Sequence, residues 1–262
     1  MQRKFKTRLA ADIGGTFTDV AAFDQKTLKL LLGKTLSTPS KLVNGISEGV
    51  EKAKTKYSDA ELFLHGSTVA INTMLERTGS KTALLITEGF RDIYEIGRIN
   101  RPDAYNLFFR KHIPLVERAL CLEVKERITA EGEIYIPLDE QGVHALCDKM
   151  IEEKVESVAI LLFHCYKNPA HEERVKEIVL ERMPKTFVTA SHELSQEYRE
   201  FERCSTVVSN AYIGPKVSAY VAEINEHIHS QGFKGSFLIV QSTGGLYESQ
   251  QAQQQCLSLI HI

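Results

Sequence analysis

Short apolar segments of strand length alternate with amphipathic segments of helix length through the middle of this chain. The apolar segments are ELFLHG (61–66), KTALLIT (81–87) and ESVAILLF (156–163), and helical patterns occupy 67–79, 139–155 and 168–183. Apolar runs of this kind indicate strands buried on both faces, which is typical of parallel sheets. The alternation therefore predicts an α/β fold, in which helices pack against a largely parallel sheet.

The first part of the chain differs, because three strand patterns follow one another without a helix. They are predicted at residues 7–13, 18–24 and 28–36. The pair Gly14-Gly15 separates the first two, so we expect a meander with this glycine turn at one tip. A helix is predicted over residues 40–57, where apolar residues recur at helical spacing.

Later segments give four further expectations. Residues 98–114 have no regular period, and residues 121–138 predict a β-hairpin that turns at Glu131-Gly132. A long helix over 195–232 should be kinked or split at Gly214-Pro215, and a strand follows at 236–241.

Three positions test the helix predictions in detail. Gly79 is expected just after the end of helix 67–79, and Asn168 is expected to cap helix 168–183. Ile151 is expected to face the core from helix 139–155, together with Val143, Leu146 and Met150.

Composition excludes several classes of partner. The chain has 262 residues, 43% of them hydrophobic and 25% charged, with a formal net charge of −2. This balance gives no reason to expect binding to nucleic acid, and no apolar run is long enough to cross a membrane. The five cysteines are dispersed and unpaired by motif, and no secretion signal opens the chain, so we expect free thiols and a cytoplasmic protein.

The glycine turn carries the clearest chemical pattern, in the segment AADIGGTFTDV. Backbone N–H groups at Gly14 and Gly15 can form a concave anion site, and Thr16 and Thr18 add hydroxyl groups to its rim. Asp12, at the end of the preceding strand, is placed to hold a hydrated Mg²⁺ ion. The alternative is that the glycines only satisfy a tight turn.

The segment HGSTVAINTML places His65, Ser67 and Thr68 where a strand ends and a helix begins. A helix N-terminus attracts anions, and Asn72 lies one turn further along the helix. The alternative here is that Ser67 or Thr68 only caps the helix.

Five segments in this order resemble the ATP-dependent hydantoinase A/5-oxoprolinase family. They are DIGGTFTDV, HGSTVAINTMLERTG, LLITEGFRDIYEIGR, EYREFERCSTVVSNAYIGP and QSTGGL. The resemblance implies the actin/sugar-kinase-like (ribonuclease H-like) ATPase fold, with a mixed sheet, flanking helices and a truncated second lobe. It also implies a hydantoinase/oxoprolinase N-terminal domain over 7–190 and the start of a hydantoinase A domain over 204–262.

The resemblance further implies ATP and Mg²⁺ as cofactors, with catalytic roles for Asp12, Thr16, His65 and Thr68. Gly14, Gly15, Thr16 and Thr18 would bind phosphate, and Ser67, Asn72 and Arg98 would contact substrate or phosphate. The family usually has Thr at the position of Ser67. The implied reaction is the hydrolysis of a cyclic amide such as a hydantoin or 5-oxoproline after phosphorylation of a carbonyl oxygen. A hydantoinase B-type subunit is the implied partner.

Three other functions stay open at this point. One is an ATP-dependent ketone carboxylase subunit, one is a sugar or acetate kinase, and one is a nucleotide-binding assembly module without catalysis. The family pattern continues to an S-G-P-A-G-G motif that this sequence lacks, and its last residues, QQCLSLIHI, match nothing in the family. We therefore expect a fragment that turns over slowly or not at all, with a cloning or frame-shift scar at its end.

The remaining polar residues are less informative. Arg98 and Arg101 flank the irregular loop and suit either a phosphate or a solvated surface, whereas Glu200, Glu202 and Arg203 suit structural ion pairs. In the loop, Phe108 and Phe109 fit either a subunit interface or a core plug.

The histidines predict no zinc site. His227 and His229 lie two apart on a helix and point in different directions. His171 is expected to be solvated, and His164 is expected in the core or at a strand edge.

Overall fold

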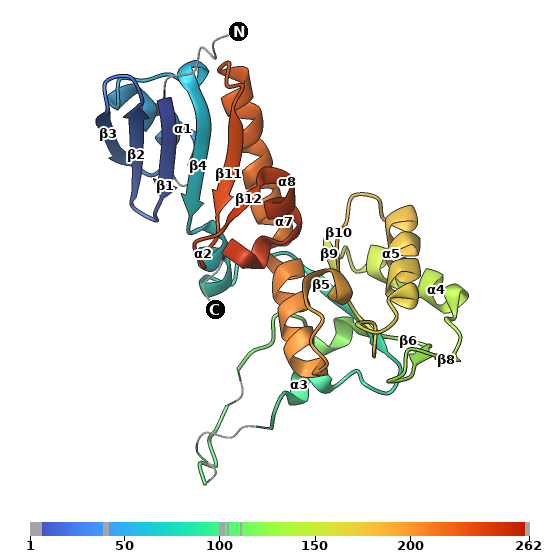
Figure 1. Ribbon diagram of the computed structural model, residues 1–262. Helices are drawn as coiled ribbons and strands as arrows, with labels where there is room; N and C mark the ends of the chain where they lie inside the picture. Colours follow the sequence, from blue (N-terminus) through green and yellow to red (C-terminus); the bar gives the residue numbers. More distant parts are fainter. Residues whose placement is uncertain (1–6, 39–41, 100–102, 104, 111, 260–262) are drawn as a thin grey trace. The chain divides into compact units, whose positions relative to one another are not determined.

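A computed structural model describes residues 7–38, 42–99, 103, 105–110 and 112–259 (Figure 1). The chain forms two compact units, one from residues 1–78 and 216–262 and the other from residues 79–215. We call them unit 1 and unit 2. The helix α7 (Glu200–Ser230) contributes its first part to unit 2 and its second part to unit 1.

Unit 1 is built on a six-stranded mixed sheet in the order β12-β11-β4-β1-β2-β3. The strands are β1 (Thr7–Ile13), β2 (Phe17–Asp24), β3 (Lys29–Leu36), β4 (Ala60–Ser67), β11 (Ser236–Val240) and β12 (Leu246–Glu248). Its helices are α1 (Leu42–Lys52), η1 (Tyr57–Asp59), α2 (Val69–Leu75), α8 (Ser249–Gln254) and η3 (Cys256–Leu259). The first three strands form the predicted antiparallel meander, and β4 and β11 continue the sheet in parallel with β1.

Helices α1 and α7 cover one face of this sheet. Leu9, Ala11 and Ile13 of β1 are buried on that face, and α7 packs there with Val217, Val221, Ile224 and Ile228 buried as predicted. A side chain at Gly33 of β3 would collide with the backbone of Gly49, so the glycines let α1 lie directly on the strands. The alternate residues of β1, such as Ala10 and Asp12, lie on the opposite face and are partly or fully exposed.

Unit 2 contains a four-stranded parallel sheet in the order β10-β9-β5-β6 and a separate two-stranded hairpin, β7-β8. The strands are β5 (Thr82–Thr87), β6 (Cys121–Val124), β7 (Arg127–Ile128), β8 (Ile134–Ile136), β9 (Ser157–Leu161) and β10 (Phe187–Ala190). The helices are α3 (Ile93–Ile96), η2 (Arg118–Leu120), α4 (Glu140–Glu152), α5 (Ala170–Arg182) and α6 (Ser191–Leu194). Every residue of β5 and β9 is buried, as expected for central strands of a parallel sheet.

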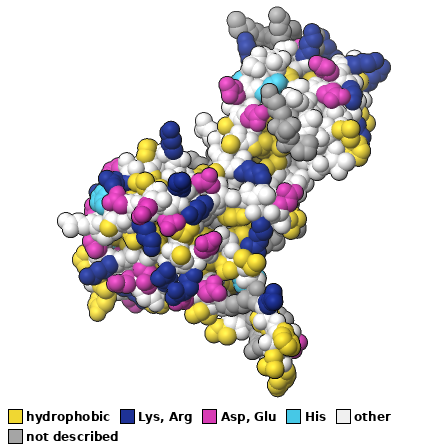
Figure 2. Space-filling model, turned by 180° about the vertical axis from the view of Figure 1, so that it is seen from behind, with side chains coloured by type: hydrophobic (Ala, Val, Ile, Leu, Met, Phe, Trp, Pro, Cys, Tyr) yellow, Lys and Arg dark blue, Asp and Glu magenta, His cyan; other side chains and the backbone are white. Residues whose placement is uncertain are grey.

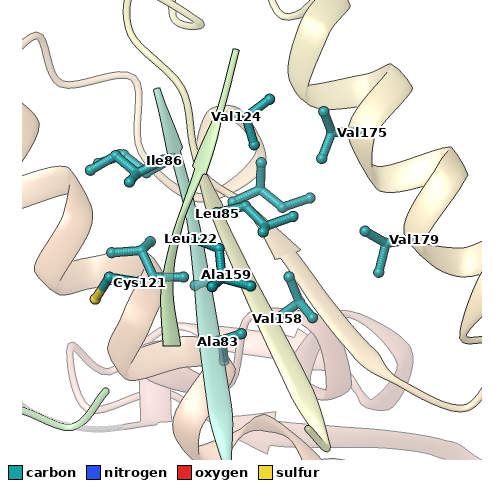
Figure 3. Close-up of a cluster of buried hydrophobic side chains, with 14 of the residues drawn as sticks. Ala83, Leu85, Ile86, Cys121, Leu122, Val124, Val158, Ala159, Val175 and Val179 are labelled. Atoms are coloured by element: carbon teal, nitrogen blue, oxygen red, sulfur yellow. The ribbon is translucent and has the colours of Figure 1, made fainter. Parts of the chain in front are cut away.

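The core of unit 2 forms between this sheet and its helices. Figure 3 shows Leu85 and Val158 facing Val175 and Val179, which α5 presents on one side of the sheet. Each fully buried side chain of this size stabilises the fold by about 1.5–3 kcal/mol relative to an exposed one. Asn168 accepts a hydrogen bond from the Ala170 backbone N–H at 3.1 Å, but the N-cap of α5 is Pro169, one residue later than predicted.

Three further expectations about secondary structure and burial were wrong. Helix α2 ends at Leu75, so Gly79 does not cap it, and a side chain there would collide with the Tyr212 ring. Residues 121–138 do not form one hairpin, because β6 joins β5 in parallel and only β7 and β8 pair across the turn at Gly132. Ile151 is 48% exposed, and the core position belongs to Cys147, which is fully buried.

Of the two outcomes expected at Gly214-Pro215, a split does not occur, because Pro215 lies inside the continuous helix α7. The two compact units nevertheless divide between Pro215 and Lys216. Gly214 is required for packing, because a side chain at this position would collide with the Phe187 ring. Among the described residues, no helix combines the length and the hydropathy that a membrane crossing requires.

Candidate functional site

One edge of the unit 1 sheet brings together the carboxyl ends of three neighbouring parallel strands, β1, β4 and β11 (Figure 1). From β1 the chain adds β2 and β3 on one side, whereas β4 and β11 lie on the other side. The strand order therefore reverses between β1 and β4. Open α/β sheets bind ligands beyond the carboxyl ends of the strands at such a reversal, so this edge is the candidate site.

The Gly14-Gly15 turn lies at this edge and is held from behind by Ser37. The Gly14 N–H donates to the Phe17 carbonyl at 2.9 Å, and the Ser37 hydroxyl donates to the Gly14 carbonyl at 2.8 Å. Thr18 Oγ1 lies 3.0 Å from Ser37 Oγ and is fully buried. Thr18 therefore supports the turn from beneath instead of standing on its rim, where the sequence pattern had placed it.

The conformation of the turn bears on why glycine is present. Neither Gly14 nor Gly15 has a positive φ, so the backbone angle alone does not require glycine at either position. A Cβ added at Gly15 would meet no atom within 4 Å, and Thr16 is exposed beside it. Within the described part of the chain, the N–H groups of Gly15 and Thr16 have no hydrogen-bond partner. These features favour close approach of a ligand over a purely structural turn.

Two carboxylates stand beside the turn on the exposed face of the sheet. Asp12 of β1 pairs in register with Asp19 of β2, and residues directly opposite each other point to the same face. Both side chains line a surface hollow of ≈ 610 Å³, together with Lys34, whose Nζ lies 3.0 Å from Asp19 Oδ1. Gly66 of β4 makes room for Asp12, because a Cβ there would lie 2.9 Å from Asp12 Oδ1.

These groups fit a hydrated magnesium ion next to a phosphate. Like charges directly opposite each other repel, so a divalent cation between Asp12 and Asp19 would relieve that repulsion. The described residues contain no cluster of three or more His, Cys, Asp or Glu side chains that could hold a metal. A Mg²⁺ ion bound by these two carboxylates would keep water and phosphate oxygens as its other ligands, which is its usual preference.

His65 lies behind the turn, in the core. Its ring is completely buried, with Nδ1 at 3.2 Å from the Ala11 carbonyl and Nε2 at 2.7 Å from the Tyr220 hydroxyl. A carbonyl can only accept, so Nδ1 carries the proton and Nε2 accepts from Tyr220. Burial lowers the pKa of His65 to about 4, so the ring is neutral at pH 7. His65 therefore ties β1, β4 and α7 together from within the core.

This burial predicts a pH-dependent stability. The pKa of His65 falls from 6.5 in the unfolded chain to about 4 in the folded one, so the stabilising contribution is fully present above pH 6.5. It is lost as the pH falls toward 4, because only the unfolded chain then binds the proton. We expect His65→Gln to reduce the pH dependence of the unfolding free energy by about 3 kcal/mol between these limits.

Urea denaturation at a series of pH values measures this difference. His229→Gln is the matched control, because His229 is exposed in the same unit and should keep the wild-type profile. Equal pH profiles for wild type and His65→Gln would show that the buried ring does not titrate as described.

Ser67 is the last residue of β4, and Thr68 and Asn72 follow it at the same edge of the sheet. Thr68 occupies the N-cap position of α2, but its side chain makes no capping hydrogen bond. Its hydroxyl donates to the Ile13 carbonyl at 3.3 Å and so ties the end of β4 to the end of β1. Ser67 Oγ accepts from the Val69 N–H at 3.2 Å, and Asn72 Nδ2 donates to Thr68 Oγ1 at 3.3 Å. Helix α2 has only seven residues, so the expected anion site at its N-terminus has no support.

Two features of this edge were given no role in the site from the sequence, although the segment QSTGGL (241–246) was part of the family resemblance. Asp19 becomes visible only through the hairpin register, which places it opposite Asp12. A second glycine pair, Gly244-Gly245, follows β11 and turns the chain into β12. Gly244 has a φ of 86°, and a Cβ there would meet no atom within 4 Å. Because β11 is parallel to β4, this turn lies at the same edge of the sheet as the Gly14-Gly15 turn.

Comparison with known proteins identifies the chain's family. The model of the hydantoinase/oxoprolinase N-terminal region matches residues 8–183, and the hydantoinase/oxoprolinase model matches residues 203–261. The second match includes residues 254–261, so the expectation that the segment QQCLSLIHI matches nothing in the family was wrong. The chain belongs to the hydantoinase/oxoprolinase family. Caprolactamase subunit alpha of Pseudomonas jessenii is 34% identical over 93% of this chain and 36% of its own length. 5-Oxoprolinase 1 of Arabidopsis thaliana is 30% identical over 92% of this chain and 21% of its own length.

Two solved structures share the fold. Nucleotide-free acetone carboxylase has a TM-score of 0.85 at 27% identity, covering 97% of this chain and 39% of that one. The crystal structure of ATP-dependent caprolactamase from Pseudomonas jessenii has a TM-score of 0.80 at 34% identity, and the match covers 92% of this chain and 36% of that one. The mixed sheet with flanking helices is therefore a property of the family and agrees with the expected actin-like fold. This family member spans about a third of the length of relatives such as caprolactamase subunit alpha.

The other polar residues suggested by the sequence belong to unit 2. Arg98 forms an ion pair with Glu202, which gives the EYREFER segment the structural pairing that was expected. Arg203 is completely buried, and its guanidinium donates to the Leu162 carbonyl at 2.9 Å. Arg101 lies outside the described residues.

The expectation that His171 is solvated was wrong. The side chain is buried, and Nδ1 lies 2.8 Å from Glu126 Oε2, because α5 turns its first residues toward the sheet. His164 does lie beside the core, where Nδ1 is 2.7 Å from the Ile128 carbonyl. His227 and His229 have separate partners, Ser47 and the Asn225 carbonyl.

Proposed function

We propose that this protein is part of an enzyme that uses ATP and Mg²⁺ to open a cyclic amide, such as a lactam or a hydantoin. The observation that carries the proposal is the open Gly14-Gly15 turn with Asp12 and Asp19 beside it, at the strand reversal of unit 1. Relatives named caprolactamase subunit alpha and 5-oxoprolinase support it.

The chemistry explains why such a reaction needs a nucleotide. A lactam carbonyl is a poor electrophile because its nitrogen donates electron density, and ATP supplies the phosphoryl group that removes this donation. The free N–H groups of Gly15 and Thr16 would bind phosphate oxygens, and Asp12 and Asp19 would hold the cation. Ser67 and Asn72 lie at the neighbouring strand end, where they would orient the phosphate or the substrate. His65 would keep β1 and β4 in register from behind.

A second candidate is the carboxylation of a ketone. The TM-score of 0.85 with acetone carboxylase and the 30% identity with the acetophenone carboxylase gamma subunit of Aromatoleum aromaticum favour it. Both candidates need the same activation of a carbonyl oxygen, so the phosphate site does not distinguish them.

The test is ADP release by the full-length polypeptide, purified with the product of the neighbouring gene. Caprolactam, hydantoin and 5-oxoproline represent the proposed substrates, acetone and acetophenone with bicarbonate represent the second candidate, and hexoses represent a kinase. We expect ADP release to depend on a cyclic amide and to yield the ring-opened amino acid. Release that depends only on a ketone or a hexose would overturn the proposal, and nucleotide binding without turnover would favour an assembly module.

We further propose a cytoplasmic, reducing location. All five cysteines are free and buried. Burial raises the pKa of Cys121 to about 11 and that of Cys165 to about 12, so these thiols are protonated and unreactive at neutral pH. A chain with five unpaired thiols suits a compartment in which thiols stay reduced.

We propose that a second subunit binds the loop between α3 and η2. Its described residues include a group of exposed apolar side chains, and Figure 2 shows hydrophobic side chains gathered at the end of this loop. Tyr105, Leu107 and Phe108 are each at least 90% exposed, which contradicts the core-plug alternative for Phe108. Relatives named as alpha, beta and gamma subunits support a multi-subunit enzyme, and the sequence resemblance points to a hydantoinase B-type partner.

Phe108→Ser tests this interface. We expect the melting temperature of the isolated chain to stay within about 2 °C of wild type, because a surface substitution rarely changes stability by more than ~0.5 kcal/mol. Co-purification with the second subunit should fall at least about tenfold, as for loss of an aromatic hot spot. Tyr135→Ser is the matched control, since Tyr135 is 73% exposed on β8 of the same unit. Normal co-purification of Phe108→Ser would reject the interface.

A further inference from the structure

Unit 1 has a second cavity, at the opposite end of the sheet from the glycine turn. Its volume is ≈ 660 Å³, within the range of small-molecule sites. Residues from the C-terminal half of α1, from the segment through η1 and from the end of α7 line it. η1 leads into the first residue of β4, whereas the turn follows the last residue of β1, so a strand length of about 20 Å separates the two sites.

The wall of this cavity contains a buried hydroxyl group without a partner. Tyr57 is only 6% exposed, and its hydroxyl oxygen is shielded from water; Ser47 lies beside it, but the pair lacks the geometry of a regular hydrogen bond. Burial raises the pKa of this hydroxyl to about 12, so it is a neutral O–H donor at physiological pH. An unsatisfied buried donor is costly and rare, which indicates a group that acquires its acceptor from outside the chain.

Two more polar side chains meet beside Tyr57 in the same wall. Ser47 Oγ lies 2.7 Å from His227 Nε2 and 3.1 Å from the Val43 carbonyl. The His227 ring packs edge-on against the Tyr57 ring, with 6.0 Å between the centroids. A ligand oxygen that enters between Ser47 and His227 therefore comes within reach of three polar groups, at the expense of one existing hydrogen bond.

Charged residues at the mouth of the cavity define what it can bind. Lys54 and Lys56 are exposed and line the mouth, and Glu51 is the one acidic residue among the lining residues. Two ammonium groups against one carboxylate favour an anion over a cation. A suitable ligand therefore has a hydrogen-bond acceptor for the buried Tyr57 hydroxyl and a negative charge for Lys54 and Lys56 at the mouth.

We propose that this cavity is a second ligand site, which binds a small dicarboxylate. One carboxylate accepts a hydrogen bond from the Tyr57 hydroxyl beside Ser47 and His227. The other carboxylate forms ion pairs with Lys54 and Lys56. The site is separate from the proposed phosphate site and does not depend on the activity proposed for it.

Calorimetric titration of the 262-residue chain with glutarate tests the proposal. We expect saturable binding of glutarate and at least tenfold weaker binding of glutaramide, which keeps an oxygen acceptor but has no charge. Tyr57→Phe should weaken glutarate binding about tenfold, the usual effect of losing one hydrogen bond to a charged group. The melting temperature of ligand-free Tyr57→Phe should equal or exceed that of wild type, because the unsatisfied hydroxyl is gone.

Two further variants complete the test. Lys54→Gln with Lys56→Gln should weaken glutarate binding at least about tenfold through loss of both charges. Lys29→Gln is the matched control, because Lys29 is an exposed residue of β3 that does not line the cavity, and this variant should bind as wild type does. The absence of saturable binding by both glutarate and its longer homologue adipate would overturn the proposal. Unchanged affinity of Tyr57→Phe, accompanied by a lower melting temperature, would also overturn it, because Tyr57 would then be only structural.

Discussion

Gly15→Val in the full-length protein is expected to reduce ATP turnover on the order of 10²-fold or more while leaving stability nearly unchanged. The position faces open space, so the new side chain meets no atom of the chain and costs little in folding. It would instead occupy the space through which a phosphate approaches the Gly15 and Thr16 N–H groups. A displacement of about 1 Å at a reacting centre can account for a loss of this size. ADP release and thermal denaturation of the same preparation measure the two effects.

Gly15→Ala provides the graded comparison, because it adds a single methyl group at the same position and should give an intermediate loss. A Gly15→Val protein with wild-type turnover would show that the turn binds no phosphate. A large fall in melting temperature would instead show that the turn is structural.

Asp12→Asn should have the second large effect. Replacing one of two opposed carboxylates by an amide weakens the proposed cation site, and metal activation of a phosphoryl oxygen is worth several kcal/mol of barrier. We expect turnover to fall about 10²-fold or more and the Mg²⁺ concentration for half-maximal activity to rise at least about tenfold. Titration of ADP release with Mg²⁺ at saturating ATP measures both.

Asp24→Asn is the matched control for this change. Asp24 lies at the other end of the same strand pair, opposite Thr7, where its carboxylate accepts hydrogen bonds from the Lys26 and Thr27 N–H groups. It should leave the Mg²⁺ titration unchanged. An Asp12→Asn protein with the wild-type Mg²⁺ titration curve would exclude Asp12 as a cation ligand.

The strands of this fold were predictable because their signal is local. Continuous apolar runs mark β5 and β9, and the meander of β1 to β3 follows from three strand patterns without a helix between them. The failures occur where a distant contact decides the outcome. In the sequence, Gly79 and Gly214 look like residues that end or interrupt a helix. In the structure each position requires glycine because an aromatic ring packs against it, Tyr212 against Gly79 and Phe187 against Gly214. Nothing within a few residues of either glycine reveals that ring.

The candidate site was predictable only in part for a similar reason. Gly15, Thr16 and Asp12 are adjacent in the sequence and were found together, and their position at a strand reversal fits that prediction. Thr18 was expected on the rim of the turn and His65 at the active site, but alternation along β2 and β4 turns both side chains toward the helices. Asp19 required the strand register, and Gly244-Gly245 required the neighbour of β4, neither of which a single motif contains.

The insertion of unit 2 between Thr78 and Lys216 has a consequence for synthesis on the ribosome. Strand β4 leaves the exit tunnel long before its parallel neighbour β11, because residues 68–235 must be translated first. At ~5–20 residues per second this delay is on the order of ten seconds or more, during which one edge of β4 lacks its neighbour. Unit 2 is continuous in the chain and can complete its own sheet in that interval. Lys216 Nζ lies 2.9 Å from Thr78 Oγ1 in the finished unit 1, so the nascent chain returns to within a side chain's length of where it left. Because unit 2 can fold before β11 is translated, the folded insert keeps the chain that leads to β11 close to the partly formed sheet of unit 1.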